Sequence, residues 1–196
     1  MSISSILDEQ VLRVALAAVV LSSFGIYSAA NVETRKASVL TGRLDDAIPF
    51  MPIFSVPYLL YLPYLFFVIG YGIIASRWWA NIAASALAVQ LAAAAVYRVH
   101  QTHVPRPAVH GGDVFSRLTA FIYRHDAPYS CFPSLHVAYA LLSLYWSVHL
   151  FPAAFPAFAG FTALIILSTL FIKQHSVADV VAGASVTALT LLILGA

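Results

Sequence analysis

A histidine and an aspartate stand four residues apart near the end of the chain, where an apolar stretch begins. In a helix this spacing places His175 and Asp179 on one face, one turn apart. A carboxylate that accepts a hydrogen bond from one ring nitrogen fixes the imidazole tautomer and leaves the other nitrogen free to attack an electrophile. Taken alone, such a pair more often fastens a helix end than performs chemistry.

A second imidazole follows a proline and a serine at the start of another apolar stretch. Backbone N–H groups at a helix N-terminus, together with the hydroxyl of Ser134, form an anion-binding site. His136 beside such a site can protonate a departing alkoxide. The alternative is that Pro133 and Ser134 only begin the helix, as a first-turn proline and a capping serine.

Two prolines flank an arginine in a third, polar segment. Pro105 and Pro107 stiffen the backbone around Arg106, whose guanidinium can hold two phosphate oxygens at once. An arginine in a loop is weak evidence by itself, because arginines are common at membrane interfaces. The three segments together predict a site that binds an anion beside a nucleophilic histidine.

Two other patterns do not lead to a site. His100 and His103 are three residues apart like a metal-binding pair, but no carboxylate or cysteine completes a ligand set. We expect loop or interfacial histidines there, with a role in substrate binding as the alternative. Cys131 is the single cysteine, and nothing near it in sequence activates its thiol, so it is predicted to be a small packing residue.

The composition indicates a protein whose solvent is a lipid bilayer. Of the 196 residues, 61% are hydrophobic and 9% are charged, and the mean hydropathy is +0.88. Soluble domains carry about a quarter charged residues, so this chain in water would expose apolar surface that it could not cover. A net charge of +2 without a basic run gives no sign of a nucleic-acid partner.

Crossing a hydrocarbon core of about 30 Å takes about 20 mostly apolar residues in a helix. We therefore expect an all-α integral membrane bundle of about six transmembrane helices, formed by residues 1–196 as a single domain without internal repeats. The predicted spans are Val11–Ala30, Phe50–Ala75, Ala80–Val99, His136–Leu150, Phe155–Ile172 and Val177–Leu194.

The first two spans have alternative interpretations. Asp8 and Glu9 stand where a signal peptide would be basic, so we expect an uncleaved span rather than a signal sequence cleaved near Ser28-Ala29-Ala30. Prolines at positions 49, 52, 57 and 63 predict that the second span enters the membrane irregularly and becomes a regular helix after Pro63.

With six spans, every chemistry-bearing residue falls on one side of the membrane. That side holds the segments Asn31–Ala47, His100–Ser134 and Lys173–Ser176, whereas both termini and the turns Ser76–Trp79 and Phe151–Ala154 lie on the other. Charged and imidazole groups at a membrane boundary are costly unless they are paired or used. Their convergence is an independent argument for a site.

The motifs together resemble those of the type-2 phosphatidic acid phosphatase superfamily, in particular its branch with inositol-phosphorylceramide-synthase-like proteins. That family carries Lys, six residues, Arg-Pro; then Pro-Ser-Gly-His; then Ser-Arg, five residues, His, three residues and Asp. The matching residues here, in the same order, are Arg106, Pro107, Pro133, Ser134, His136, Ser168, His175 and Asp179. The motif resemblance covers residues 98–183, and the six-helix layout extends it to the whole chain.

Three positions depart from the family pattern and alter the expected phosphate-binding cage. The motif lysine would be Val99, the motif arginine is Thr169, and the motif glycine is Leu135. Arg98, one residue away, and Lys173, one turn further along the helix, are the candidates to supply the two missing positive charges.

The resemblance implies a role for each residue. His175 attacks phosphorus and becomes a phosphohistidine, while Asp179 orients it and stabilises its positive charge. His136 protonates the departing oxygen and later deprotonates the water that hydrolyses the intermediate. The phosphate-binding residues would be Arg106, Ser134, Lys173 and Arg98. The family chemistry needs no metal and no other cofactor.

Three functions are compatible with these residues. The first is a lipid phosphatase that acts on a lipid phosphate or pyrophosphate, such as phosphatidic acid, phosphatidylglycerol phosphate, an isoprenyl pyrophosphate or lipid A. The second is a phosphotransferase, in which a lipid or sugar hydroxyl resolves the phosphohistidine. The third is a non-catalytic membrane subunit, in which His136, His175 and Asp179 should lie more than about 10 Å apart.

The expected location is the cell (inner) membrane of a bacterial-type cell, with membrane lipids as neighbours. When the candidate phosphate ligands are set aside, five lysines and arginines lie on the membrane side that holds the site and two lie on the other side. This excess of positive charge predicts that the site faces the cytoplasm. The resemblance implies a periplasmic one, because many bacterial relatives face that way. The sequence predicts neither the orientation nor the oligomeric state.

Overall fold

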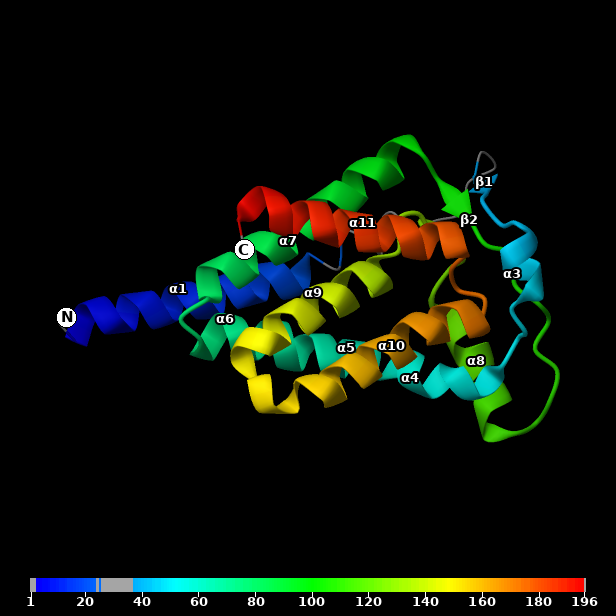
Figure 1. Cartoon of the computed structure of the whole chain (residues 1–196), viewed down its shortest axis with the longest axis horizontal. Helices are drawn as coiled ribbons and strands as arrows, with labels where there is room; N and C mark the ends of the chain where they lie inside the picture. The colour runs from blue at the N-terminus through cyan, green and yellow to red at the C-terminus, as the bar shows by residue number, and fades with distance from the viewer. Residues whose placement is uncertain (1–2, 24, 26–36, 196) are drawn as a thin grey trace.

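The computed structural model describes residues 3–23, 25 and 37–195, and its architecture is an all-α bundle with one short two-stranded sheet. The main helices run along the long axis of the molecule (Figure 1). They are α1 (Ile3–Ser22), α4 (Ser55–Leu59), α5 (Tyr61–Leu65), α6 (Tyr71–Ala75), α7 (Trp79–Val99), α9 (Leu135–Leu150), α10 (Phe155–Phe171) and α11 (Val177–Leu194).

Within the described residues, four helical segments are long and apolar enough to cross a membrane, namely Pro52–Ala75, Trp79–Val99, Pro152–Phe171 and Val177–Leu194. They correspond to the second, third, fifth and sixth predicted spans, and the last has the predicted bounds. The fourth predicted span is α9, whose 16 residues make a rod of about 24 Å. Because α9 packs against α5, α7, α10 and α11, it lies inside the bundle.

The apolar core surrounds α9. Tyr139 and Leu142 of this helix are fully buried, and they belong to one cluster with Ile69 and with Ile82 and Ala86 of α7. The buried hydroxyl of Tyr139 donates to the carbonyl of Ala86 at 2.9 Å, which joins α9 to α7. The core therefore holds α9 rigidly, and with it the residues at its N-terminus.

The first predicted span is found only in part. α1 carries Asp8, Glu9 and Arg13, and among the described residues it is not one of the four segments that meet the length and apolarity of a span. Arg13 pairs with Glu9 at 2.6 Å and donates to the carbonyl of Ser76 at 2.8 Å, which fastens α1 to the α6–α7 turn. Residues 24 and 26–30 of that span, including the alternative cleavage site, lie outside the described residues.

The second span is helical from Pro52, but it is not a uniform α-helix before Pro63: it begins with a 3-10 turn at Pro52–Phe54 and is interrupted at Leu60 between α4 and α5. The regular helix expected after Pro63 is wrong, because a π-helical turn, Phe66–Gly70, follows it. Pro52 and Pro57 fall in first turns, where helical N–H groups have no intrahelical partner in any case. The hydrogen bonds continue past them, with the N–H of Tyr64 donating to the carbonyl of Leu60 at 3.1 Å.

The short elements gather at one end of the bundle, opposite the N-terminal end of α1 and the C-terminal end of α11 (Figure 1). They are α3 (Arg43–Ala47), α8 (Val114–His125) and two parallel strands, β1 (Ser38–Val39) and β2 (Thr102–His103), in the register Ser38 with Thr102. The predicted site segments all reach this end.

Helix α8 was not predicted from the sequence. Its cap is Asp113, whose carboxylate accepts hydrogen bonds from the N–H groups of Phe115 at 2.9 Å and Ser116 at 3.1 Å. The hydroxyl of Ser116 also donates to this carboxylate and lowers the pKa of Asp113. Tyr123 in its last turn donates to the carbonyl of Ile172 at 2.6 Å, so α8 covers the end of α10.

Candidate active site

A left-handed turn carries the chain from α10 into α11. Lys173 has φ +54°, its N–H donates to the carbonyl of Leu170 at 3.1 Å, and the N–H of Gln174 donates to the carbonyl of Thr169 at 2.9 Å. This pair of hydrogen bonds is the Schellman motif, in which the left-handed position is usually glycine. Lys173 therefore lies beyond the end of α10 rather than on it, which corrects the predicted placement.

The turn delivers His175 to the start of α11. Ser176 is the cap of that helix: its hydroxyl accepts from the N–H of Asp179 at 3.2 Å, and the Asp179 carboxylate accepts from the N–H of Ser176 at 2.7 Å. His175 thus stands one residue before the cap of α11 and not within the helix. Asp179 therefore caps the end of α11, which is the alternative to a chemical role for this pair. Only Oδ2 of its carboxylate accepts the capping hydrogen bond.

His175, Asp179 and His136 converge. Nδ1 of His175 lies 3.6 Å from Oδ2 of Asp179, and Nε2 of the same ring lies 3.4 Å from Nδ1 of His136. His175 and Asp179 are buried. Both distances are well below the separation of more than about 10 Å that is expected of a non-catalytic subunit.

Two tyrosines hold the ring of His136. The rings of Tyr58 and Tyr61 each lie 4.6 Å from it, centroid to centroid. The hydroxyl of Tyr58 donates to the carboxylate of Asp126 at 2.8 Å. Neither tyrosine was predicted from the sequence as a partner of His136, and nor was Asp126, the residue directly after α8.

The N-terminus of α9 lies directly against α11. Ser134 is the buried cap of α9, and its hydroxyl accepts from the N–H of Val137 at 3.3 Å. Its own N–H donates to the carbonyl of Asp179 at 3.1 Å. Ser134 therefore caps α9 and also lies beside the pair of His175 and Asp179. Gly183 makes this approach possible, because a Cβ there would lie 2.4 Å from the Ser134 carbonyl oxygen.

Three neighbouring residues orient the guanidinium of Arg106. Its guanidinium donates to the side-chain oxygen of Gln174 and, at 2.7 Å, to the carbonyl of Asp126, and it lies 4.7 Å from the centre of the Tyr123 ring. Burial raises the pKa of Tyr123 to about 12, so this phenol stays protonated and keeps its hydrogen bond to α10. Nε of Arg106 has no hydrogen-bond partner within the described part of the chain. Gln174 was missed, although it directly precedes His175.

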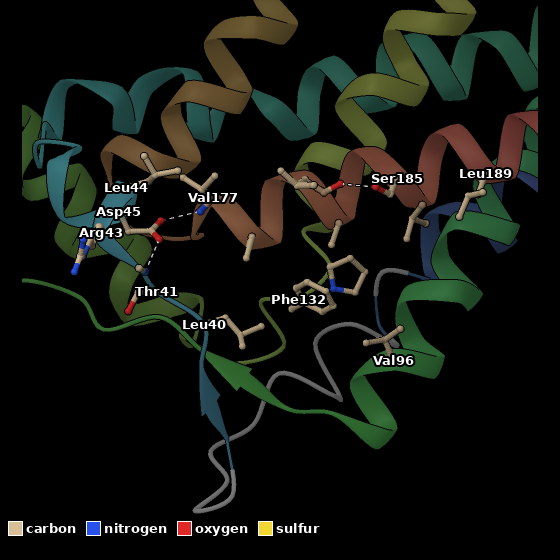
Figure 2. Close-up of a pocket in the computed structure, with 16 residues that line it drawn as sticks. Leu40, Thr41, Arg43, Leu44, Asp45, Val96, Phe132, Val177, Ser185 and Leu189 are labelled. Carbon is tan, nitrogen blue, oxygen red and sulfur yellow. Dashed lines mark hydrogen bonds between the residues drawn. The ribbon is translucent and has the colours of Figure 1, made fainter.

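The ammonium of Lys173 fastens the segment around α3. It donates to the carbonyls of Asp45 at 2.7 Å and Ile48 at 2.6 Å. The carboxylate of Asp45 in turn accepts from the N–H of Val177 at 2.8 Å (Figure 2). Asp45 therefore covers the N-terminus of α11, and nothing in the sequence pattern indicated this long-range contact.

Each histidine of the pair lines a different cavity. One has a volume of about 500 Å³ and is lined by Arg106, Lys173 and His175. The other, of about 320 Å³, is lined by His136 and mainly by apolar and aromatic residues, among them Tyr58 and Leu135. The first, which we call the cationic cavity after Arg106 and Lys173, is also lined by Asp45 and Asp46. The second suits a hydrocarbon group.

A third hollow runs along the outer face of α11 (Figure 2). This groove has a volume of about 820 Å³, with Arg43 at one end and Leu189 toward the other. It contains none of the predicted site residues, but it shares Thr41 and Asp45 with the cationic cavity.

Arg98 does not reach the site. It is exposed in the last turn of α7, where a positive charge complements the helix dipole, and it does not line the cationic cavity. The chain passes through β2 before it returns with Arg106, so the one-residue shift from the motif position carries Arg98 away.

Cys131 lies close to His175 and Asp179. Burial raises the pKa of its thiol, as does the neighbouring Asp179 carboxylate, and the thiol donates to the carbonyl of Pro128 at 3.2 Å. Among the described residues, the group that could hold a metal ion is Cys131 with His175 and Asp179, rather than His100 with His103.

One comparison with known proteins gives a match. A family model described as the PAP2 superfamily matches residues 50–193, a range that contains all of the predicted site residues. No curated protein and no solved structure matches the chain.

Proposed function

The chain belongs to the PAP2 superfamily, and on this premise we propose that it is a multi-pass membrane enzyme that hydrolyses a lipid phosphate or pyrophosphate through a phosphohistidine. One observation carries the proposal. The ring of His175 has one nitrogen 3.6 Å from the Asp179 carboxylate and the other 3.4 Å from His136. This is the arrangement that a nucleophile needs between its orienting carboxylate and a general acid.

In the first step, Nε2 of His175 bonds to phosphorus while the bond from phosphorus to the lipid oxygen breaks. His136 donates its proton to that oxygen, so the lipid leaves as a neutral alcohol or as a lipid monophosphate. Asp179 stabilises the positive charge on the phosphorylated ring. The unpartnered Oδ1 of Asp179 is available for this interaction as the ring shifts.

In the second step, His136 is neutral and takes a proton from water. The water oxygen attacks phosphorus, the bond to His175 breaks, and inorganic phosphate leaves. Both histidines return to their starting protonation states, and the reaction needs no metal ion.

The cationic cavity supports the placement of the phosphate. Arg106 offers Nε, and Lys173 uses two of its three N–H donors on carbonyls, which leaves one for a phosphate oxygen. The left-handed backbone of Lys173 supports a role for its side chain. A position where glycine is the usual residue carries a lysine at a cost of about 1 kcal/mol.

The apolar pocket supports a lipid as the leaving group. It lies on the His136 side of the pair, where the departing oxygen must receive its proton. The surroundings would be the inner membrane of a bacterial-type cell, with the site at the bilayer boundary.

A second candidate is a phosphotransferase of the same membrane. The observation that favours it is the groove along α11, which shares Thr41 and Asp45 with the cationic cavity. A lipid in that groove would bring a hydroxyl toward the phosphohistidine in place of water.

The test is phosphate release by the detergent-purified protein from lipid monophosphates and pyrophosphates, in the presence of a chelator. We expect release from at least one lipid, and loss of release in His175→Ala. The matched control is His110→Ala, which removes an exposed histidine of the loop before α8.

Release that needs added metal would contradict the proposed mechanism. No release, together with transfer to an added lipid or sugar alcohol, would favour the phosphotransferase. If the protein catalyses neither reaction, the result would favour the non-catalytic subunit.

A further inference from the structure

Three potential metal ligands from two separate segments lie together behind the catalytic face of His175. Cys131 comes from the loop before α9, and His175 and Asp179 come from the start of α11. One donor atom of each lies within 4.8 Å of the others, and their exposed fractions are 2%, 5% and 0%. A sulfur, a nitrogen and a carboxylate oxygen therefore face one buried point.

Two of these residues carry a buried polar atom that is unsatisfied within the described part of the chain. Nδ1 of His175 and Oδ1 of Asp179 have no hydrogen-bond partner, although both residues are more than nine-tenths buried. The other oxygen of Asp179 is held by the N–H of Ser176 at 2.7 Å, so Oδ1 is the free one. Buried polar atoms are seldom left unpaired without a reason.

We propose that Cys131, His175 and Asp179 form a binding site for a thiophilic divalent cation such as Zn²⁺, and that occupation of this site inhibits the enzyme. Only the inhibition rests on the function proposed above. Sulfur, imidazole and carboxylate are the usual zinc ligands, and three protein ligands with an open fourth position are a common set.

The geometry requires a local contraction of the site. In a tetrahedral zinc site, ligand bonds of about 2.0–2.3 Å place two donor atoms roughly 3.3–3.8 Å apart. The candidate donor atoms lie within 4.8 Å of one another, so a pair at that limit must approach by roughly 1 Å. The cationic cavity, lined by His175, provides the way in for a hydrated ion.

Binding is an exchange of a cation for protons. The Cys131 thiol gives up its proton to solvent, its hydrogen bond to Pro128 is lost, and Nδ1 of His175 must be unprotonated. No electron is transferred. The thiolate and the Asp179 carboxylate then neutralise the two charges of the ion.

The consequence for catalysis follows from which ring nitrogen is used. An ion on Nδ1 of His175 withdraws electron density from Nε2, the atom that attacks phosphorus. It also occupies the Asp179 oxygen that would stabilise the phosphorylated ring. The ion is therefore an inhibitor rather than a cofactor.

The binding test uses Co²⁺ alone as the probe, because a thiolate bound to Co²⁺ gives a charge-transfer band in the near ultraviolet. We expect this band in the purified wild-type protein, saturating at one ion per chain, and its loss when Zn²⁺ is added. The band should be absent in Cys131→Ser and in His175→Ala, and it should persist in His110→Ala. A wild-type protein without the band, or a band that persists in Cys131→Ser, would overturn the site.

The inhibition test measures phosphate release with increasing Zn²⁺, relative to release by the same protein in chelator. We expect Cys131→Ser to need at least about tenfold more Zn²⁺ than the wild type for half inhibition. Cys131→Ala replaces it if the serine variant does not fold. Equal sensitivity of variant and wild type would reject the inhibitory role.

Different experimental results would reject the hydrolase and the metal site. A cobalt–thiolate band in a protein that releases no phosphate would keep the metal site and reject the hydrolase. Metal-free phosphate release by a protein without the band would keep the hydrolase and reject the metal site.

Discussion

Gly183 of α11 lies so close to Ser134 that a Cβ at position 183 would stand 2.4 Å from the Ser134 carbonyl oxygen and 3.2 Å from the Cβ of Val137. Both contacts belong to the first turn of α9, which carries His136. The separation of His136 from His175 is therefore set by the absence of a side chain one helical turn beyond Asp179.

We predict that Gly183→Ala separates α9 from α11. Backbone cannot give way as a flexible side chain can, so the free energy of unfolding should fall by about 1–3 kcal/mol. Phosphate release should fall at least about tenfold, because the two histidines move apart. Thermal unfolding and a phosphate-release assay measure the two effects.

Gly160→Ala is the matched control. Gly160 lies in α10 with nothing within 4 Å of an added Cβ, so the same substitution should be neutral or stabilise the helix by up to about 1 kcal/mol. Equal behaviour of the two variants would mean that the close approach at Gly183 does not position the site.

Gln174 is predicted to position Arg106. Its side-chain oxygen accepts from the guanidinium, which the Asp126 carbonyl also holds at 2.7 Å. Hydrogen bonds to charged groups contribute about 1.5–3 kcal/mol, so Gln174→Ala should lower kcat/KM by about 10- to 100-fold. Steady-state kinetics on a lipid phosphate measure this loss.

A positioning role also predicts that the two residues are coupled. Gln174→Ala combined with Arg106→Ala should be little worse than Arg106→Ala alone. Additive losses in the double variant would instead give Gln174 a role that does not pass through Arg106.

Lys173 has an unfavourable left-handed backbone conformation and an ammonium group that makes hydrogen bonds. Two substitutions distinguish the effects of these two features. Lys173→Gly relieves the left-handed backbone and Lys173→Ala does not, while both remove the hydrogen bonds to Asp45 and Ile48. The glycine variant should be more stable than the alanine variant by about 1 kcal/mol. Both should lose phosphate release to a similar extent, as measured on a shared substrate.

Full activity in Lys173→Gly would contradict a role of the ammonium in phosphate binding. In that case the lysine would serve only to hold the α3 segment, and release of Asp45 from Val177 would be harmless.

The helices could be predicted because each is a local feature of the chain. α11 was predicted with both bounds, since its apolar run lies between the cap Ser176 and Gly195, which has φ +63°. α8 was missed because its 12 residues mix polar and apolar side chains and lack the long apolar run that marks a span.

The site could be predicted only where spacing along the chain carries the information. His175 and Asp179 are a local pair, and their motif could be recognised. Gln174, Asp126 and Asp45 act through contacts between segments that are far apart in sequence, and no periodicity reports such contacts. Arg98 shows the converse, since a nearly correct position in the motif does not bring a side chain to the cavity.

Asp179 has two roles, and two substitutions distinguish them. Its carboxylate accepts from the N–H of Ser176 to complete the helix cap, and it also faces Nδ1 of His175 at 3.6 Å. Asp179→Asn keeps an oxygen that can accept from Ser176, but it removes the negative charge that would stabilise the phosphorylated histidine of the proposed reaction. Its stability should therefore stay within about 1 kcal/mol of the wild type, while kcat falls about 100-fold or more. Ser176→Ala should show the opposite pattern, with a loss of about 1 kcal/mol in stability from the missing cap and most of the activity kept. Thermal unfolding and kcat, measured on the same preparations, decide between the roles: an Asp179→Asn variant with wild-type kcat would leave Asp179 as a helix cap alone.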